Sequence, residues 1–255
     1  MERLRRYLLP GELEKEEGFR REIQRLAHLG LLVIGGAEIA IALFMLLARF
    51  LVSPDPEVTH LRILQALIVV AIGLATLAGA KVKSLYQWSR TLGICSGLSV
   101  AAVLIWVTTL MSVYDPTADD FIPGQITLVI LVGVAAVPLR PTDTLLFGFL
   151  VECQYILLHL AAQRLDLVVT DAEPIYVLFI FMLTLLASAL TAVLYEQRRS
   201  NYQARLSTVR AAEHLRLSEA RNLLAQNAAS VGRLAAALSH EFNSPVGALV
   251  SGVDT

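Results

Sequence analysis

The residues of this chain best suited to chemistry stand in the segment HEFNSP at positions 240–245. His240 is a nucleophile, because imidazole titrates at about pH 6.5 and keeps an unprotonated nitrogen at neutral pH. The adjacent Glu241 can orient the ring and take up its proton. Pro245 removes a helix hydrogen bond and is expected to bend a helix just beyond the histidine. The segment therefore predicts an activated histidine on a helix.

Two other interpretations of the His-Glu pair compete with this one. Such a pair is common on a solvated helix surface, and HExxH is the zinc-binding helix of a class of proteases. The fifth position of that motif is Ser244 here, so the second zinc-binding histidine is missing. The surroundings favour a functional histidine over a solvated pair, since the segment follows six apolar runs and a charged helical stretch.

In that setting the residues ALSHEFNSPVGAL resemble the dimerisation and phosphotransfer helix of bacterial sensor histidine kinases. The family pattern is His-Glu, then two variable positions, then a residue that is often Thr or Asn, and finally Pro. The resemblance implies that His240 is the phosphoacceptor, attacking the γ-phosphorus of ATP in line, with Glu241 as the base. It also implies transfer of the phosphoryl group to an aspartate on a response-regulator receiver domain. Ser244 departs from the family at the phosphatase position, where it keeps a hydroxyl but lacks the usual side chain.

The resemblance further implies ATP and Mg²⁺, held by a catalytic domain with Asn- and Gly-rich boxes. The printed sequence contains neither a Walker A motif nor GxGxxG, and it stops at Thr255, within the first helix of the phosphotransfer hairpin. We therefore expect a longer chain, in which the second hairpin helix and the ATP-binding domain follow. For these residues themselves we expect no bound cofactor and no metal.

Composition predicts the elements that must position the histidine. The chain is 56% hydrophobic and 17% charged, whereas a soluble domain has about a quarter of its residues charged. The excess falls in runs that approach the ~20 residues needed to cross a bilayer as a helix. These six predicted membrane helices cover residues 26–51, 61–80, 91–113, 124–139, 144–162 and 174–195.

The connections between the apolar runs alternate in charge. Residues 1–25 and 81–90 are rich in lysine or arginine, whereas 52–60 and 114–123 contain acidic residues and neither basic type. Under the positive-inside rule, both termini are predicted to be cytoplasmic. The resemblance to sensor histidine kinases implies that the membrane is a bacterial inner membrane. The external connections are too short to form a domain, so a stimulus should act in the membrane, at its surface or through a partner. The net charge of −1 suggests no nucleic-acid partner.

Ionisable residues interrupt two of the runs. Glu38 lies in the first, and Glu152 and His159 lie in the fifth. Glu152, Tyr155 and His159 are three and four residues apart, so they share a helix face that should point into the bundle. Such residues predict an intramembrane site for a proton, a cation or a small polar-headed, membrane-soluble ligand. Hydrogen bonding between helices is the alternative interpretation.

A heptad seam leads from the last apolar run to His240. It has gaps of three and four residues, which is typical of a parallel coiled coil, and it contains Asn227, a residue that favours two strands. A homodimer is therefore expected. The seam residues are Leu217, Ala220, Leu224, Asn227, Val231, Leu234 and Leu238.

These patterns predict an all-α chain with four parts. They are a cytoplasmic segment (1–25), a six-span bundle (26–195), a coiled-coil linker (196–230) and the start of a phosphotransfer domain (231–255). Together with the resemblance, they favour the function of a membrane sensor histidine kinase. The alternative is a small transporter or channel with a cytoplasmic dimerisation helix, in which Glu38 and Glu152 would serve translocation.

Overall fold

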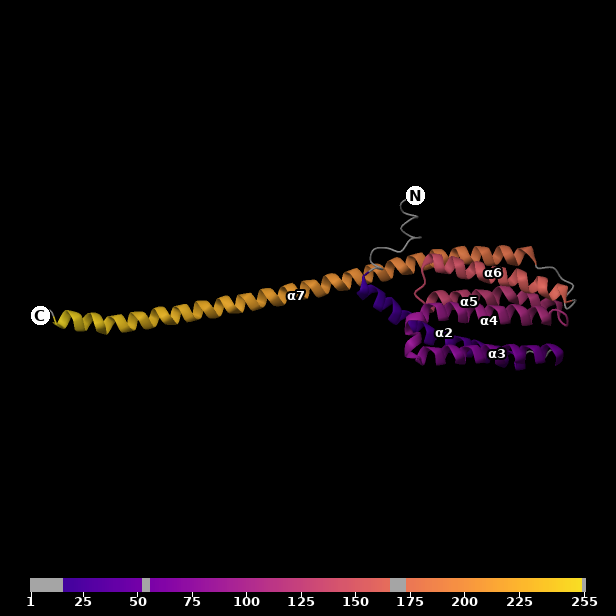
Figure 1. Ribbon diagram of the computed structural model, residues 1–255, viewed down its shortest axis with the longest axis horizontal. Helices are drawn as coiled ribbons and strands as arrows, with labels where there is room; N and C mark the ends of the chain where they lie inside the picture. Colours follow the sequence, from indigo (N-terminus) through magenta and orange to yellow (C-terminus); the bar gives the residue numbers. More distant parts are fainter. Residues whose placement is uncertain (1–15, 52–55, 166–172, 254–255) are drawn as a thin grey trace, which may run out of the picture. The chain divides into compact units, whose positions relative to one another are not determined.

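The computed structural model describes residues 16–51, 56–165 and 173–253, and all regular structure within these ranges is helical. The prediction of an all-α chain is therefore confirmed for the described residues (Figure 1). The elements are α2 (Glu17–Leu51), α3 (Pro56–Lys81), η2 (Lys83–Trp88), α4 (Ser89–Met111), η3 (Pro116–Phe121), α5 (Ile122–Ala136), α6 (Pro141–Arg164) and α7 (Pro174–Val253). Both η elements are short 3₁₀ helices.

Long apolar helices make this a membrane protein. In the described part of the chain, five helices are long and apolar enough to cross a bilayer, namely α2, α3, α4, α6 and α7. The shorter α5 has 15 residues, about 22 Å at the usual helical rise, against a hydrocarbon thickness of about 30 Å. It ends at Ala136, earlier than the predicted residue 139, because Val137 is extended and Pro138 follows it. The number of membrane passes stays a prediction.

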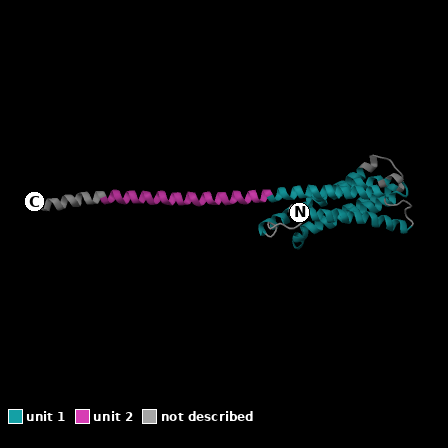
Figure 2. Ribbon diagram, turned by 90° about the horizontal axis from the view of Figure 1, so that it is seen from above, with its two compact units in different colours: residues 1–199 teal, residues 200–255 magenta. Residues whose placement is uncertain are grey.

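The chain divides into two compact units, residues 1–199 and 200–255 (Figure 2). The division lies close to the expected boundary between the bundle and the linker, at residues 195 and 196. The described part of the second unit consists of the C-terminal portion of α7. At 80 residues, α7 has a contour of about 120 Å.

Within the first unit, α4 is the central helix. It packs against α2, α3, α5 and α6. Half of its most apolar stretch is buried, compared with 22–33% for the other candidate membrane helices. Polar side chains on α4 therefore have neighbours on several helices, and the same holds for its glycines.

One face of α5 supplies much of the core. Ile122, Ile126, Ile130 and Val134 follow one another at intervals of four residues and are all almost fully buried. A spacing of four keeps side chains on one side of a helix. This stripe packs in one apolar cluster with residues of α4, α6 and α7, including Ala101, Ile105, Phe147, Val151, Tyr155, Ile180 and Ala187.

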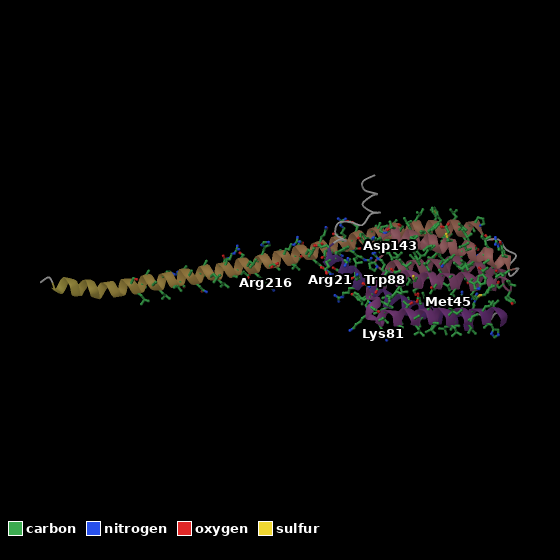
Figure 3. All side chains as sticks on the ribbon, in the orientation of Figure 1. Arg21, Met45, Lys81, Trp88, Asp143 and Arg216 are labelled. Atoms are coloured by element: carbon green, nitrogen blue, oxygen red, sulfur yellow. The ribbon has the colours of Figure 1, made fainter. Side chains whose placement is uncertain are left out.

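Two ends of the bundle can be distinguished by their connections (Figure 1). At the η2 end, Arg90 Nε donates a hydrogen bond to Pro138 O at 3.1 Å, so the start of α4, directly after η2, and the turn before α6 are neighbours. At the η3 end, Tyr176 of α7 donates to Asp120 Oδ1 at 2.6 Å. In Figure 3, Arg21, Lys81 and Trp88 lie toward the η2 end.

The first helix begins in hydrophilic sequence, at Glu17, before the predicted apolar run at residue 26. An ion pair between Glu17 and Arg21, one turn apart, is of the kind that stabilises exposed helix. On the opposite side Phe19 is buried, with its ring edge-on to Tyr195 of α7 at 6.4 Å between centroids. The segment predicted as a separate N-terminal part thus contributes to the bundle; its residues 1–15 lie outside the described ranges.

Candidate functional site

Glu38 lies buried where three helices meet. It stands near the middle of the apolar part of α2 and is only 7% exposed. Ser96 of α4 donates a hydrogen bond to Glu38 Oε1 at 2.7 Å. The same Ser96 hydroxyl lies 2.6 Å from the hydroxyl of Thr76 on α3. A chain of oxygen atoms therefore joins α2, α4 and α3 at the depth of the membrane interior.

The second carboxyl oxygen of Glu38 is not used in this way. Glu38 Oε2 is buried and has no hydrogen-bond partner among the described residues. An unsatisfied buried polar atom costs about 1–3 kcal/mol, so a partner at this position would be stabilising. Glu38 lines a cavity of about 50 Å³, larger than the roughly 10–15 Å³ that one water requires. The remaining walls are almost entirely apolar side chains of α2, α3, α4 and α5, among them Ile41, Val69, Val100 and Val132.

A second polar cluster lies closer to the η3 end. Gln65 Nε2 of α3 donates to Leu104 O at 3.3 Å and to Thr108 Oγ1 at 3.2 Å. Thr108 donates in turn to Gln125 Oε1 of α5 at 3.1 Å. Gln65, Thr108 and Gln125 line a larger cavity of about 440 Å³ that reaches Asp120 in η3.

The two cavities are adjacent, because they share lining residues from α2 and α5. The shared residues are Met45, Gln125 and Leu128. A small guest that enters beside η3 would therefore need to pass only these side chains to reach Glu38. Met45 is an unbranched and adaptable side chain, well suited to such movement.

Sequence reasoning found Glu38 but missed the neutral residues around it. Gln65, Thr76, Ser96, Thr108 and Gln125 all stand inside apolar runs or at their ends. Their common signal is a hydrogen-bonding side chain that lipid cannot satisfy. The sequence alone does not say which of them are neighbours, because that depends on how the helices pack.

The three residues expected to share a face of α6 differ in burial. Tyr155 and His159 are almost fully buried, with ring centroids 4.5 Å apart, and His159 Nδ1 lies 3.2 Å from Tyr155 O. Glu152 is only partly buried, so the structure does not place it with them in the interior. His159 stands five residues before the end of α6, and the Tyr155 hydroxyl accepts a bond from Glu173 N at 3.2 Å. The Tyr155–His159 pair therefore lies toward the η3 end, apart from Glu38.

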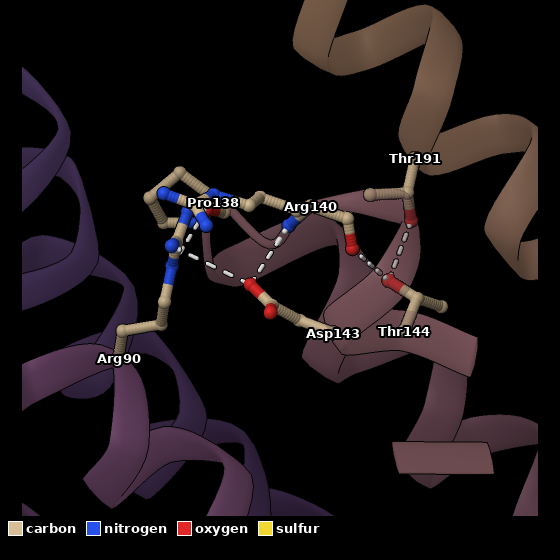
Figure 4. A network of polar contacts seen from close by, with 6 residues as sticks. All are labelled: Arg90, Pro138, Arg140, Asp143, Thr144 and Thr191. Carbon is tan, nitrogen blue, oxygen red and sulfur yellow. Dashed lines mark hydrogen bonds and ion pairs between the residues drawn. The ribbon is translucent and has the colours of Figure 1, made fainter. Parts of the chain in front are cut away.

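A polar network joins α4, α6 and α7 at the η2 end (Figure 4). Arg90 of α4 lies 3.4 Å from Asp143 Oδ2, which also accepts the backbone N–H of Arg140 at 3.1 Å. Thr144 of α6 lies 3.0 Å from Thr191 of α7, oxygen to oxygen. The position of α7 at this level is thus tied to α4 through the start of α6.

The second unit presents its apolar residues to solvent. Leu217, Leu224, Val231, Leu234 and Leu238 of the heptad seam are between 53% and 69% exposed. The backbone of α7 continues as helix to Val253 and so includes the segment with His240. The side chains of His240, Glu241, Ser244 and Pro245 lie outside those that the structure describes.

Side chains that could bind a metal are scattered in the described part of the chain. Within those ranges, no group of three or more His, Cys, Asp or Glu side chains is placed so that it could hold a metal ion. Comparisons with protein-family models, with curated proteins and with solved structures found no match to this chain. Inferences about its function therefore rest on its own residues.

Proposed function

We propose that this chain is the sensory and phosphoacceptor portion of a bacterial membrane sensor histidine kinase. The observation that supports the proposal best is α7, one helix from the apolar residues after Pro174 to Val253. A displacement of its membrane part can pass along a continuous helix to His240. The HEFNSP segment supplies the residue types that phosphotransfer needs.

In this proposal the bundle crosses the inner membrane six times, with the η2 end in the cytoplasm. The η2 end gathers Lys81, Lys83, Arg90 and Arg140, as the positive-inside rule requires of a cytoplasmic face. The η3 end carries Asp115, Asp120 and Glu173. Counting α5 together with η3 gives an even number of passes, so both termini are cytoplasmic.

The exposed seam of the second unit supports a homodimer. Five large apolar side chains at heptad spacing on a water-exposed helix leave apolar surface that a second copy would cover. In a parallel coiled coil, the two copies of His240 stand outside the seam, open to a catalytic domain. Phosphorylation across the dimer then follows the family pattern.

The chemistry assigned to the site is phosphoryl transfer. An unprotonated nitrogen of His240 would attack the γ-phosphorus of ATP that a catalytic domain holds with Mg²⁺. The bond from that phosphorus to the oxygen of the β-phosphate would break, ADP would leave, and Glu241 would take up the ring proton. The bend expected at Pro245 changes access to His240 when the helix above it moves. The phosphoryl group then passes to an aspartate of a response-regulator receiver domain. Ser244 gives no support to a phosphatase activity.

The test is labelling with γ-³²P-ATP of the full chain in lipid nanodiscs, in the presence of a separate histidine-kinase catalytic domain. We expect acid-labile, base-stable label in the wild type and none in His240→Ala. His214→Ala is the matched control, because His214 is an exposed histidine on the same helix and should leave labelling unchanged. Equal labelling of wild type and His240→Ala would refute the assignment.

The Glu38 site is proposed as the sensory input. Glu38 lines a cavity and has a buried carboxyl oxygen without a hydrogen-bond partner among the described residues, which suits a proton, a cation or the polar head of a small membrane-soluble ligand. If Glu38 reads the stimulus, Glu38→Gln should change the labelling rate of His240 severalfold without abolishing it. Ser96→Ala is the control that removes the hydrogen bonds of the Ser96 hydroxyl with Glu38 and Thr76 and keeps the carboxylate. The transporter alternative is disfavoured by the small, mainly apolar cavity around Glu38.

A further inference from the structure

A cavity of about 220 Å³ lies at the η2 end, apart from the Glu38 site. Its walls come from the start of α2, from η2 and the start of α4, from the turn before α6 and from α7. It therefore stands at the level where α7 passes from its apolar part to charged sequence. The lining residues are Phe19, Arg20, Ile23, Gln24, Ala27, Tyr86, Gln87, Ser89, Arg90, Arg140 and Tyr195.

Three arginines reach this cavity from three different elements. Arg20 belongs to α2, Arg90 to α4 and Arg140 to the turn before α6. Their lining neighbours include Gln24 and Gln87, which can also donate hydrogen bonds. Among the described residues, those that line the cavity include no acidic side chain. The cavity is therefore a concave surface rich in donors and in positive charge.

The carboxylate of Asp143, beside the cavity, offsets part of this charge. Asp143 does not line the cavity, and its Oδ2 atom lies 3.4 Å from Arg90. Burial lowers the pKa of Arg198 of α7, and repulsion by the positive charge of Arg90 lowers this pKa further. An anion in the cavity would relieve this repulsion. Guanidinium groups prefer anions with several oxygens, because their planar fork can donate two parallel bonds.

The cavity also suits a ligand with an apolar part. Its lining includes Phe19, Ile23 and Ala27 beside the arginines. Trp88, next to the lining residues Gln87 and Ser89, is 55% exposed, as is typical of an aromatic residue anchored at a membrane interface. Basic pockets between membrane helices on the cytoplasmic side are suited to lipid headgroups.

From these observations we infer that the cavity lined by Arg20, Arg90 and Arg140 is a binding site for a phosphate-bearing anion. The phosphate is supplied either by the headgroup of an anionic phospholipid or by a free phosphate compound of the cytoplasm. Bound there, it contacts α2, α4 and the start of α6 and lies against Tyr195 of α7. If the proposed function holds, the bound anion would set how firmly α7 is held at the η2 end of the bundle. It would thereby change how far a movement of α7 reaches His240.

The experiment measures binding alone, so its outcome does not depend on whether His240 accepts phosphate. The purified full chain in detergent is titrated with phosphatidylglycerol or with phosphatidylcholine, and bound lipid is counted by native mass spectrometry. We expect tighter binding of phosphatidylglycerol, weakened about tenfold by Arg20→Gln or by Arg140→Gln, since each removes bonds to a charged group. Arg20 is exposed near the start of α2, so its replacement leaves the fold intact.

Arg21→Gln is the matched control. It removes the same charge at the next position, from a side chain that does not line the cavity. It should bind phosphatidylglycerol within about twofold of the wild type, well below the change expected from losing a charged hydrogen bond. A second experiment adds inorganic pyrophosphate to the chain with bound lipid. If pyrophosphate displaces the lipid, and does so less well in Arg20→Gln, the ligand is a free phosphate compound. If it displaces none, the ligand is the lipid headgroup. The inference would be overturned if the two lipids bind equally and pyrophosphate does not change their binding, or if Arg21→Gln and Arg20→Gln weaken binding equally.

Discussion

Gly148 of α6 offers a sharp test of how α6 and α7 pack. A Cβ atom added at Gly148 would overlap the Oγ1 and Cγ2 atoms of Thr184 on α7 and would stand 2.7 Å from its Cβ. Thr184 is buried, and its hydroxyl donates to Ile180 O at 2.8 Å, so this side chain has little freedom to turn away. Gly148→Ala should therefore push α7 away from α6.

The expected size follows from two opposing terms. Alanine in place of glycine in a helix is worth about 1 kcal/mol of propensity. Overpacking a tight contact costs about 1–3 kcal/mol, and here the nearest atoms are well inside normal contact distance. We expect Gly148→Ala to be destabilised by about 1–2 kcal/mol, which is the overpacking cost minus the gain in helix propensity when the overpacking cost is the larger of the two.

The assay is thermal unfolding of the purified chain in detergent, for which 1 kcal/mol corresponds to about 2–4 °C at this chain length. Gly36→Ala and Gly79→Ala are matched controls, because a Cβ at either position meets nothing within 4 Å. They should melt at the same temperature as the wild type or a few degrees higher. Thr184→Ala in the Gly148→Ala background should recover part of the loss, since it removes two of the three crowded atoms.

Gly30 provides a contrast, because a Cβ atom there would overlap backbone atoms, and no change of a neighbouring side chain can relieve that overlap. A Cβ there would overlap the backbone O of Ala136 and stand 2.7 Å from its backbone C atom, so Gly30→Ala should destabilise at least as much as Gly148→Ala. The packing argument fails if Gly148→Ala melts like Gly36→Ala. It also fails if Thr184→Ala lowers the melting temperature equally in the wild type and in the Gly148→Ala background.

Three further predictions concern the two units. Cysteines placed at Leu224 and Val231 should each crosslink efficiently across a dimer, whereas a cysteine at Arg221, outside the seam, should not; equal crosslinking at all three would exclude the seam. Asp143→Ala should lower stability by about 1 kcal/mol, because it removes the acceptor for the backbone N–H at the start of α6, while Asp143→Asn keeps an acceptor and should lose less; a melting curve separates them. Glu38→Met should raise the melting temperature by a few degrees, because it removes an unsatisfied buried oxygen and leaves the Ser96 and Thr76 hydroxyls bonded to each other. A lower melting temperature would show that both oxygens of the carboxylate have hydrogen-bond partners.

The helices were predictable from the sequence because lipid leaves the backbone few alternatives. Apolar runs of about 20 residues must bond internally, so their helical state follows from hydropathy. Their ends depend on local chemistry that hydropathy does not report. The start of α2 at Glu17 depends on an exposed ion pair and on the burial of Phe19 against Tyr195, a residue 176 positions away.

The candidate site was predictable only in part. An ionisable residue in an apolar run, such as Glu38, is visible because it is costly in lipid. Its neighbours Ser96 and Thr76 are not, because residues this small and neutral are common in membrane helices. Helical periodicity assigns Glu152 and His159 to one face, but burial also depends on which helix lies beside each turn. Only the packing of α6 separates the two.

The central position of α4 has a mechanical consequence. Arg90, Ser96 and Thr108 bond to different neighbours near the η2 end, at the level of Glu38 and toward the η3 end. These residues span 18 positions of one helix, about 27 Å at the usual rise. Because a helix hardly changes its length, α4 behaves as a rigid rod, and an axial shift of it would alter the contacts at all three depths together. A change at either face of the membrane would then shift α4 at the other face as well. The same shift would reach α7 through the contacts at the start of α6.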